Sequence, residues 1–171
     1  NQISYWRWII APYKDICQVE KPTDLSESIV RMGKYGLEQQ LSSCDLNEDG
    51  QGDYLFVFSE KRNDPNAHQR VVILLSGEGV HKYRLLIAPD FCDKEWPLHQ
   101  IVCKGNYFTI EFKDNKFVAE LYITFKYDKH TNNFLLHRYG YIDLSGGTQE
   151  PKREVQLTTK DFGEIFFEDF Y

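Results

Sequence analysis

The sequence predicts a mainly β protein, α+β at most, built as an antiparallel meander sheet or a sandwich. Three observations support this prediction. Phe, Tyr and Trp make up 15% of the 171 residues, and aromatic and β-branched residues favour pleated sheets. Apolar runs of strand length recur between polar turns. The alternation of Phe117, Ala119, Leu121, Ile123 and Phe125 has a period of two residues, which is typical of a strand with one buried face.

The expected elements follow in chain order. A strand is expected over 3–10, and a short helix from Asp24 to near Lys34, because Asp24 and Glu27 have the spacing of a capping box. Further strands are expected over 54–58, 71–75, 80–87, 101–104, 107–112, 116–127 and 134–143. The run 54–58 is continuously apolar, which predicts a central strand. A loop at 146–151 and an apolar tail at 162–170 that packs on the core complete the chain.

Length and charge restrict the classes of protein. A chain of 171 residues suits one domain over 1–171, since a domain takes about 100–200 residues. Its 20 basic and 26 acidic residues give a net charge of −6, which argues against a nucleic-acid partner. The longest apolar stretches are much shorter than the roughly 20 residues of a transmembrane helix. We therefore expect no membrane span.

The compartment is inferred from the first residue and the cysteines. The sequence begins at Asn1 without an initiator Met or an apolar leader, so we expect a secreted or periplasmic protein whose signal peptide has been removed. The four cysteines show no zinc-site spacing. Two disulfides are expected, Cys17–Cys44 and Cys92–Cys103, and four buried free thiols are the alternative.

One segment carries oxygen-bearing side chains at the spacing of a calcium loop. Counted from Asp45, loop positions 1, 3, 5 and 9 are Asp45, Asn47, Asp49 and Asp53. Gln51 at position 7 would contribute its backbone carbonyl, and Gly50 at position 6 allows the sharp turn. A hard cation takes about 6–8 oxygen ligands, and it would relieve the repulsion among the three aspartates. We expect bound Ca²⁺; the alternative is an Asp/Asn/Gly-rich β-turn that binds nothing.

The segment differs from a helix–loop–helix calcium site. Position 12 is Phe56 instead of a glutamate, and the loop runs into the expected strand at 54–58. In this it resembles the calcium loop of FG-GAP and VCBS-type repeats, over about residues 44–87. Only one copy is present, which excludes a full propeller. The stretch around 158–164 resembles small, uncharacterised secreted bacterial proteins that carry one such loop, and this resemblance implies no activity.

We expect no catalytic centre. The five histidines are scattered, and Ser76 lacks the G-x-S-x-G frame of a nucleophile elbow. A carboxylate pair for glycoside hydrolysis is the alternative, drawn from four glutamates: Glu111, Glu120, Glu164 and Glu168. Tryptophans at 6, 8 and 96 could instead form a sugar-binding platform, although buried core rings are the default.

These observations predict a non-enzymatic calcium-binding domain that recognises a protein outside the cytoplasm. An acidic, irregular segment is expected to face the partner, through Asp90, Asp93, Glu95 and Trp96. The partner would be a basic toxin or enzyme, and the protein an inhibitor or a periplasmic immunity protein. A carbohydrate-binding module and a small carboxylate-dependent hydrolase are the alternatives.

Overall fold

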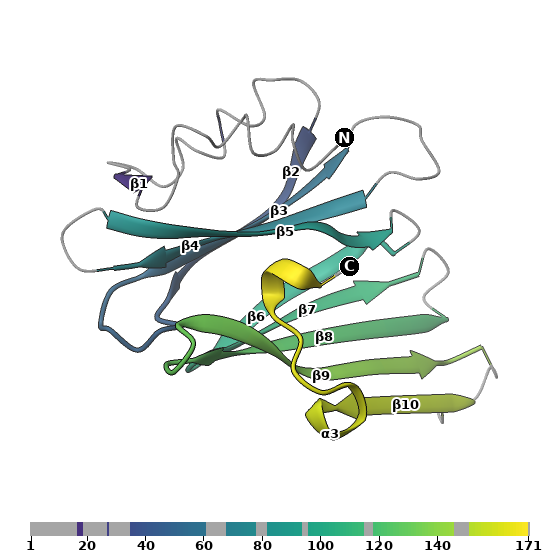
Figure 1. Cartoon of the computed structure of the whole chain (residues 1–171). Coiled ribbons are helices and arrows are strands. Elements are labelled where there is room, and N and C mark those ends of the chain that lie inside the picture. The colour runs from purple at the N-terminus through teal and green to yellow at the C-terminus, as the bar shows by residue number, and fades with distance from the viewer. Residues whose placement is uncertain are drawn as a thin grey trace.

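The computed structural model describes residues 17–18, 27, 35–60, 68–77, 82–93, 96–114, 118–145 and 151–170. Its strands form two antiparallel sheets (Figure 1). Sheet A has the order β1-β5-β4-β3-β2, with β1 at Cys17–Gln18, β2 at Tyr35–Cys44, β3 at Asp53–Glu60, β4 at His68–Ser76 and β5 at Lys82–Asp93. Sheet B has the order β10-β9-β8-β7-β6, with β6 at Leu98–Lys104, β7 at Tyr107–Lys113, β8 at Ala119–Asp128, β9 at Asn133–Asp143 and β10 at Arg153–Thr158. The predicted mainly β class is confirmed, as a sandwich of two meanders.

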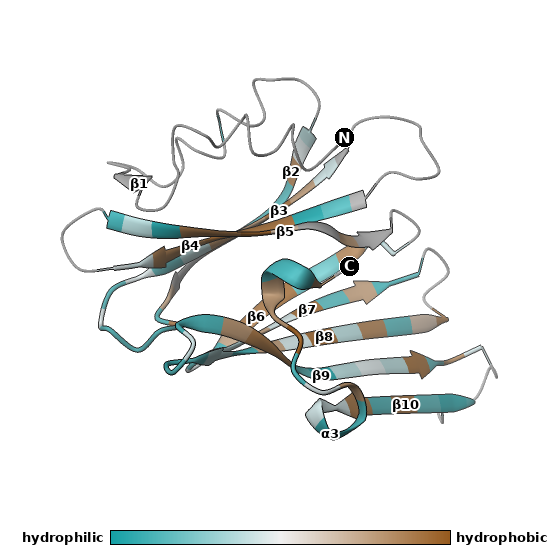
Figure 2. Ribbon diagram, in the orientation of Figure 1, coloured by the Kyte–Doolittle hydropathy of each residue, from teal (hydrophilic) through white to brown (hydrophobic). Residues whose placement is uncertain are grey.

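The sheets face each other across one apolar core, visible as the brown segments in Figure 2. Phe117, the first residue of the predicted alternation, lies outside the described residues. The alternation is confirmed from Ala119 onward, because Ala119, Leu121, Ile123 and Phe125 are all at most 7% exposed. The residues between them are partly exposed on the outer face of sheet B. One face of this sheet is therefore buried and the other meets solvent, as a period of two requires.

Strands β3 and β4 are buried on both faces. Leu55 and Val57 contribute to the core between the sheets, while Phe56 and Phe58 on the opposite face of β3 are also 0% exposed. An uninterrupted apolar run is typical of a strand covered on both sides. The prediction of a central strand at 54–58 is confirmed, as is the hairpin of β4 and β5.

The C-terminal segment packs against the core. After the short helix α3 (Thr159–Phe162), Phe166 forms a bridge with Leu135 of β9, and the 3-10 helix η2 (Phe167–Asp169) follows. Phe167 is 0% exposed, and its ring lies 5.3 Å from that of Phe125. Figure 1 shows this segment, in yellow, lying between β5 and β9. The prediction that the apolar tail packs is confirmed.

A disulfide joins the two sheets. It links Cys44 at the end of β2 to Cys103 of β6, with 6.2 Å between their Cα atoms. Both expected bridges, Cys17–Cys44 and Cys92–Cys103, are wrong, because each uses a cysteine already bonded elsewhere. The physical reason is that β2 and β6 are edge strands of different sheets, and packing the sheets brings these edges together. The side chains of Cys17 and Cys92 lie outside the described residues.

Three of the described strands were not predicted: the two-residue strand β1, and the longer strands β2 and β10. β2 contains polar residues and Gly36, and its pairing with β3 is interrupted by two register shifts. β10 is an edge strand with mostly exposed side chains, which hides the periodicity that burial imposes. The strand expected over 3–10 lies outside the described residues. So does the expected helix at 24–34, apart from Glu27, which is helical.

Candidate metal centre

The predicted calcium loop connects β2 to β3 and has the backbone that a tight turn requires. Glu48 and Gly50 both have positive φ, 58° and 84°. Glycine adopts this conformation at little cost, so the expected role of Gly50 as the turn residue agrees with the backbone. Leu46 is 0% exposed and belongs to the core between the sheets. The loop is therefore anchored by an apolar side chain at its second position.

Asp53 fastens the end of the loop to β4. Its carboxylate is 0% exposed and accepts hydrogen bonds from the backbone N–H of Leu46 at 2.6 Å and of Ser76 at 2.7 Å. It also accepts one from the Ser76 hydroxyl at 2.7 Å. Burial raises the pKa of Asp53, while these donors act in the opposite direction. Asp53 is thus a buried carboxylate held at two points by the backbone.

Asp45 organises the exposed side of the loop. Its Oδ1 accepts from the backbone N–H of Asp49 at 2.9 Å, and its Oδ2 accepts from that of Gly50 at 3.0 Å. Asp49 in turn accepts from the backbone N–H of Gln51 at 2.8 Å. Both carboxylates are therefore oriented by the loop's own N–H groups.

The side chains of Asn47, Asp49 and Asp53 meet at Ser76. The Asn47 amide donates to the Ser76 carbonyl at 2.8 Å and to Asp49 at 3.1 Å. The Ser76 oxygen lies 3.0 Å from Oδ2 of Asp49 and 2.7 Å from Oδ1 of Asp53. A hydroxyl has one hydrogen to donate, so the two carboxylates share a single donor. The hydroxyl hydrogen can therefore satisfy only one of them at a time, and the other depends on its remaining donors, which are N–H groups of Asn47 and Gln51 for Asp49 and of Leu46 and Ser76 for Asp53.

This arrangement fits an oxygen-ligated cation. The available ligands are carboxylate, amide and hydroxyl oxygens, and calcium and magnesium bind oxygen ligands. A cation would also offset the repulsion between the carboxylates of Asp49 and Asp53. Among the described residues, no group of three or more His, Cys, Asp or Glu side chains is placed to hold a metal by itself. Any ion would thus depend on Asn47, on Ser76 and on backbone carbonyls as well as on the aspartates.

Gln51 contributes a further link to β4, because its side-chain amide donates to the Gly77 carbonyl at 3.2 Å. The role predicted for its backbone carbonyl stays a prediction. The sequence predicts no part in the loop for Ser76, the last residue of β4. Nothing in its local sequence marks it, and only the pairing of β3 with β4 could have brought it to the loop.

The loop also reaches sheet B. Glu48 forms an ion pair of 2.8 Å with Lys129, in the turn between β8 and β9. Burial raises the pKa of Tyr127 in β8, and the negative charges of Asp53 and Asp49 act in the same direction. The candidate site therefore lies where β2, β4 and the β8–β9 turn come together.

The predicted partner-binding segment is not an irregular loop throughout. Asp90 and Asp93 belong to strand β5, so the expected irregular backbone is wrong at these two residues, whereas their role in partner binding stays a prediction. Glu95 lies outside the described residues. Trp96 is half-buried and packs against the core, with its ring edge-on to Tyr141 at 6.1 Å. Its carbonyl accepts from the Gln69 side chain at 2.7 Å. These contacts leave only part of the Trp96 ring for a partner.

Comparison with protein-family models, curated proteins and solved structures finds no match to this chain. In the described part of the chain, no helix has the length and apolar character needed to cross a membrane. The interpretation of the site therefore depends on its own residues and contacts.

Proposed function

We propose that the chain is a non-catalytic calcium-binding domain that recognises a protein partner outside the cytoplasm. The observation that carries this proposal is the Ser76 hydroxyl shared between Asp49 and Asp53. Two carboxylates that converge on one donor repel each other, and a divalent cation would remove that cost. Asp45, Asn47, Asp49 and the Gln51 carbonyl would hold the ion.

Asp53 at the start of β3 and Ser76 at the end of β4 would support the site. Asp53 already accepts three hydrogen bonds, which suits a residue that positions the loop or reaches the ion through water. Calcium bound here would neutralise the loop and stiffen the junction of the two sheets. This role is structural, because the loop's ligands would be occupied in holding the ion.

The location and the partner are inferred from other features. The disulfide Cys44–Cys103 supports an oxidising compartment, since disulfides persist there. The net charge of −6 supports a partner with a basic surface, because complementary charge steers association. An inhibitor, or a periplasmic immunity protein that binds a toxin, fits both features.

The alternative of a carboxylate-dependent hydrolase is less well supported, because one of the glutamates that it would use is unsuited to act as a general acid. The Tyr122 hydroxyl and Lys113 lower the pKa of Glu120. A general acid for glycoside hydrolysis needs a raised pKa, so Glu120 is unsuited to that role. A carbohydrate ligand without hydrolysis stays the alternative to a protein partner.

Thermal unfolding of the full chain with calcium and with a chelator tests the calcium proposal. A calcium concentration about 100 times Kd should stabilise the fold by about 2.7 kcal/mol, which raises Tm by about 5–10 °C for a chain of this size. Asp45→Asn and Asp49→Asn keep the side-chain volume but remove charge, and they should abolish this shift. Asp143→Asn is the matched control, because Asp143 accepts from a turn N–H at 2.8 Å far from the loop in sequence. Equal Tm values with calcium and with chelator would refute the proposal.

A further inference from the structure

The outer face of sheet B carries a hollow of about 270 Å³. It lies over β7, β8, β9 and β10, on the face opposite the core. Its lining includes Thr109, Glu111, Tyr122, Arg138, Gly140 and Gln156. This surface is distinct from the calcium loop, and the proposed function does not use it.

The hollow exists because β9 has a glycine in the middle of the sheet. Gly140 lies directly opposite Tyr122 of β8 on one side and Gln156 of β10 on the other. Two large side chains thus flank a position without one. The Tyr122 ring lies beside the gap, with its Cδ2 atom 3.9 Å from where a Cβ on Gly140 would be.

Neither backbone conformation nor packing requires glycine at this position. Gly140 is not among the described glycines with positive φ, and a Cβ there would meet Tyr122 no closer than 3.7 Å, an ordinary contact. Glycine inside a strand weakens it by about 0.5–1 kcal/mol. Such a glycine can mark a bulge, a bend, or a site where a ligand or another backbone approaches closely. The register shift in the β8–β9 pairing lies at Thr124/Phe125, whereas Gly140 is in regular pairing with Tyr122, so we interpret the space as open to a ligand.

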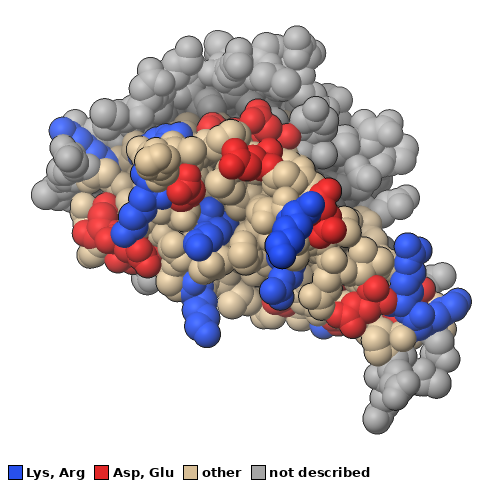
Figure 3. Space-filling model, turned by 60° about the horizontal axis from the view of Figure 1, so that its bottom comes forward, with Lys and Arg blue, Asp and Glu red and all other residues tan. Residues whose placement is uncertain are grey.

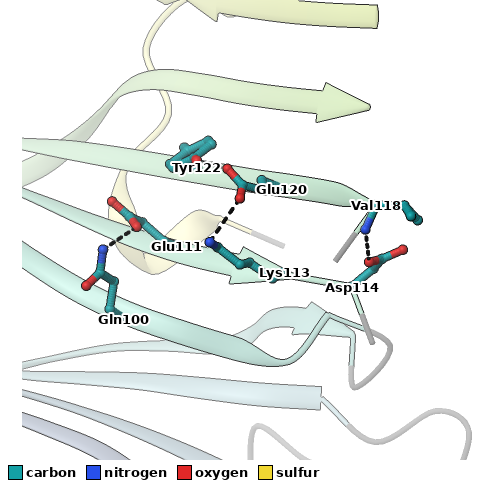
Figure 4. Close-up of polar contacts among 7 residues, drawn as sticks. All are labelled: Gln100, Glu111, Lys113, Asp114, Val118, Glu120 and Tyr122. Carbon is teal, nitrogen blue, oxygen red and sulfur yellow. Dashed lines mark hydrogen bonds and ion pairs between the residues drawn. The ribbon is translucent and has the colours of Figure 1, made fainter. Parts of the chain in front are cut away.

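The polar groups beside the gap are held in place. Glu111 accepts from Gln100 at 2.6 Å, and Glu120 forms an ion pair of 2.9 Å with Lys113 (Figure 4). The Tyr122 hydroxyl donates to the same Glu120. The Tyr122 ring is thereby fixed through its hydroxyl, and a binding surface whose groups are already ordered loses less entropy on binding.

The lining combines hydrogen-bond donors and acceptors with one aromatic face. Arg138 and Gln156 can donate, and Glu111 can accept. Acidic and basic side chains are interspersed over the face seen from beneath (Figure 3), and the carboxylates would repel an anionic ligand. A hydroxyl group both donates and accepts hydrogen bonds, so the adjacent hydroxyls of a saccharide match this lining of donors and acceptors. The C–H face of a sugar ring matches an aromatic ring.

We propose that this hollow binds a neutral saccharide, with the sugar ring against Tyr122 and hydroxyls on Glu111, Arg138 and Gln156. The Gly140 gap admits the sugar to the floor of the sheet. This inference stands whether or not the loop binds calcium.

Binding of the purified full chain to an array of neutral mono- and oligosaccharides tests it, followed by calorimetry with the strongest ligand in calcium and in chelator. Gly140→Val should fill the hollow and weaken binding at least tenfold, with no fall in Tm. Tyr122→Ala should weaken it similarly, whereas Tyr122→Phe keeps the ring and should retain much of the affinity. Tyr107→Ala is the matched control, since Tyr107 is a partly exposed ring on the same face outside the hollow.

Three results would overturn the inference. The first is an array with no bound saccharide. The second is affinity unchanged in both Gly140→Val and Tyr122→Ala. The third is binding of a charged ligand, such as a free amino acid, in place of any saccharide. Because binding is measured with and without calcium, failure of the saccharide site is distinguishable from failure of the calcium loop.

Discussion

The Ser76 hydroxyl oxygen lies 2.7 Å from Oδ1 of the buried Asp53, and this contact fastens the candidate calcium loop to β4. Replacing Ser76 with alanine removes the hydroxyl that Asp53 shares with Asp49, while the two backbone N–H groups still donate to Asp53. We expect a loss of about 1.5–3 kcal/mol in the free energy of unfolding, the contribution of a hydrogen bond to a charged group. Urea unfolding measures it. Ser59→Ala is the control, because the Ser59 hydroxyl donates to the exposed Glu38, and equal losses in both variants would contradict the role of Ser76.

The disulfide between the sheets should contribute strongly to stability. Cys44 and Cys103 are 59 residues apart, and closing a loop of this length stabilises the fold by about 4 kcal/mol in the chain-entropy treatment. Reduction, or the double variant Cys44→Ala and Cys103→Ala, should lower the urea midpoint accordingly. The double variant should no longer respond to reductant. A midpoint that reductant leaves unchanged in the unmodified chain would show that this bridge is not formed.

Phe167 should be the most important residue of the C-terminal segment. It is 0% exposed and its ring contacts several core rings. Phe167→Ala should cost about 3–5 kcal/mol, as for other buried phenylalanines. The half-buried neighbour Phe166 gives the matched comparison, and Phe166→Ala should cost clearly less. Similar losses in chemical denaturation would mean that the segment does not insert Phe167 into the core.

The pKa of Glu120 should depend on Tyr122. The Tyr122 hydroxyl, followed by Lys113, holds this pKa below its ordinary value of 4.5. Glu120 therefore contributes stability above the unfolded-state pKa, and that contribution is lost as the pH falls through the folded-state pKa. Tyr122→Phe should raise the pKa of Glu120, as followed by carboxyl-carbon NMR. Tyr107→Phe should leave it unchanged, and an unaltered Glu120 pKa in Tyr122→Phe would contradict the hydrogen bond.

The sequence predicts the strands whose side chains are buried on one face or on both faces. The uninterrupted apolar run 54–58 and the alternation on β8 both report how many of their faces are covered, and both are confirmed. β2 and β10 escape prediction because they are edge strands with polar residues. An edge strand forms by hydrogen bonding to the backbone of its neighbour. This pairing does not require a pattern of apolar side chains in the edge strand itself.

The same contrast holds for the candidate site: residues close together in sequence could be predicted as a group, and a residue distant in sequence could not. Asp45, Asn47, Asp49 and Asp53 could be proposed together because their spacing lies within nine residues. Ser76 could not, since it lies 23 residues beyond Asp53 and reaches it only through strand pairing. The disulfide fails for a related reason. The prediction paired cysteines that are near each other in sequence. The packing of the two sheets instead brings Cys44 and Cys103 close enough to form the bond.

The central claim is that the loop from Asp45 to Asp53 binds calcium, and a crystal structure of the full chain grown with calcium tests it most directly. The account predicts one ion about 2.3–2.6 Å from side-chain oxygens of Asp45, Asn47 and Asp49, with the Asp53 contacts to Leu46 and Ser76 retained. Crystals grown in saturating calcium with no ion at the loop, and with its hydrogen bonds unchanged, would contradict the claim.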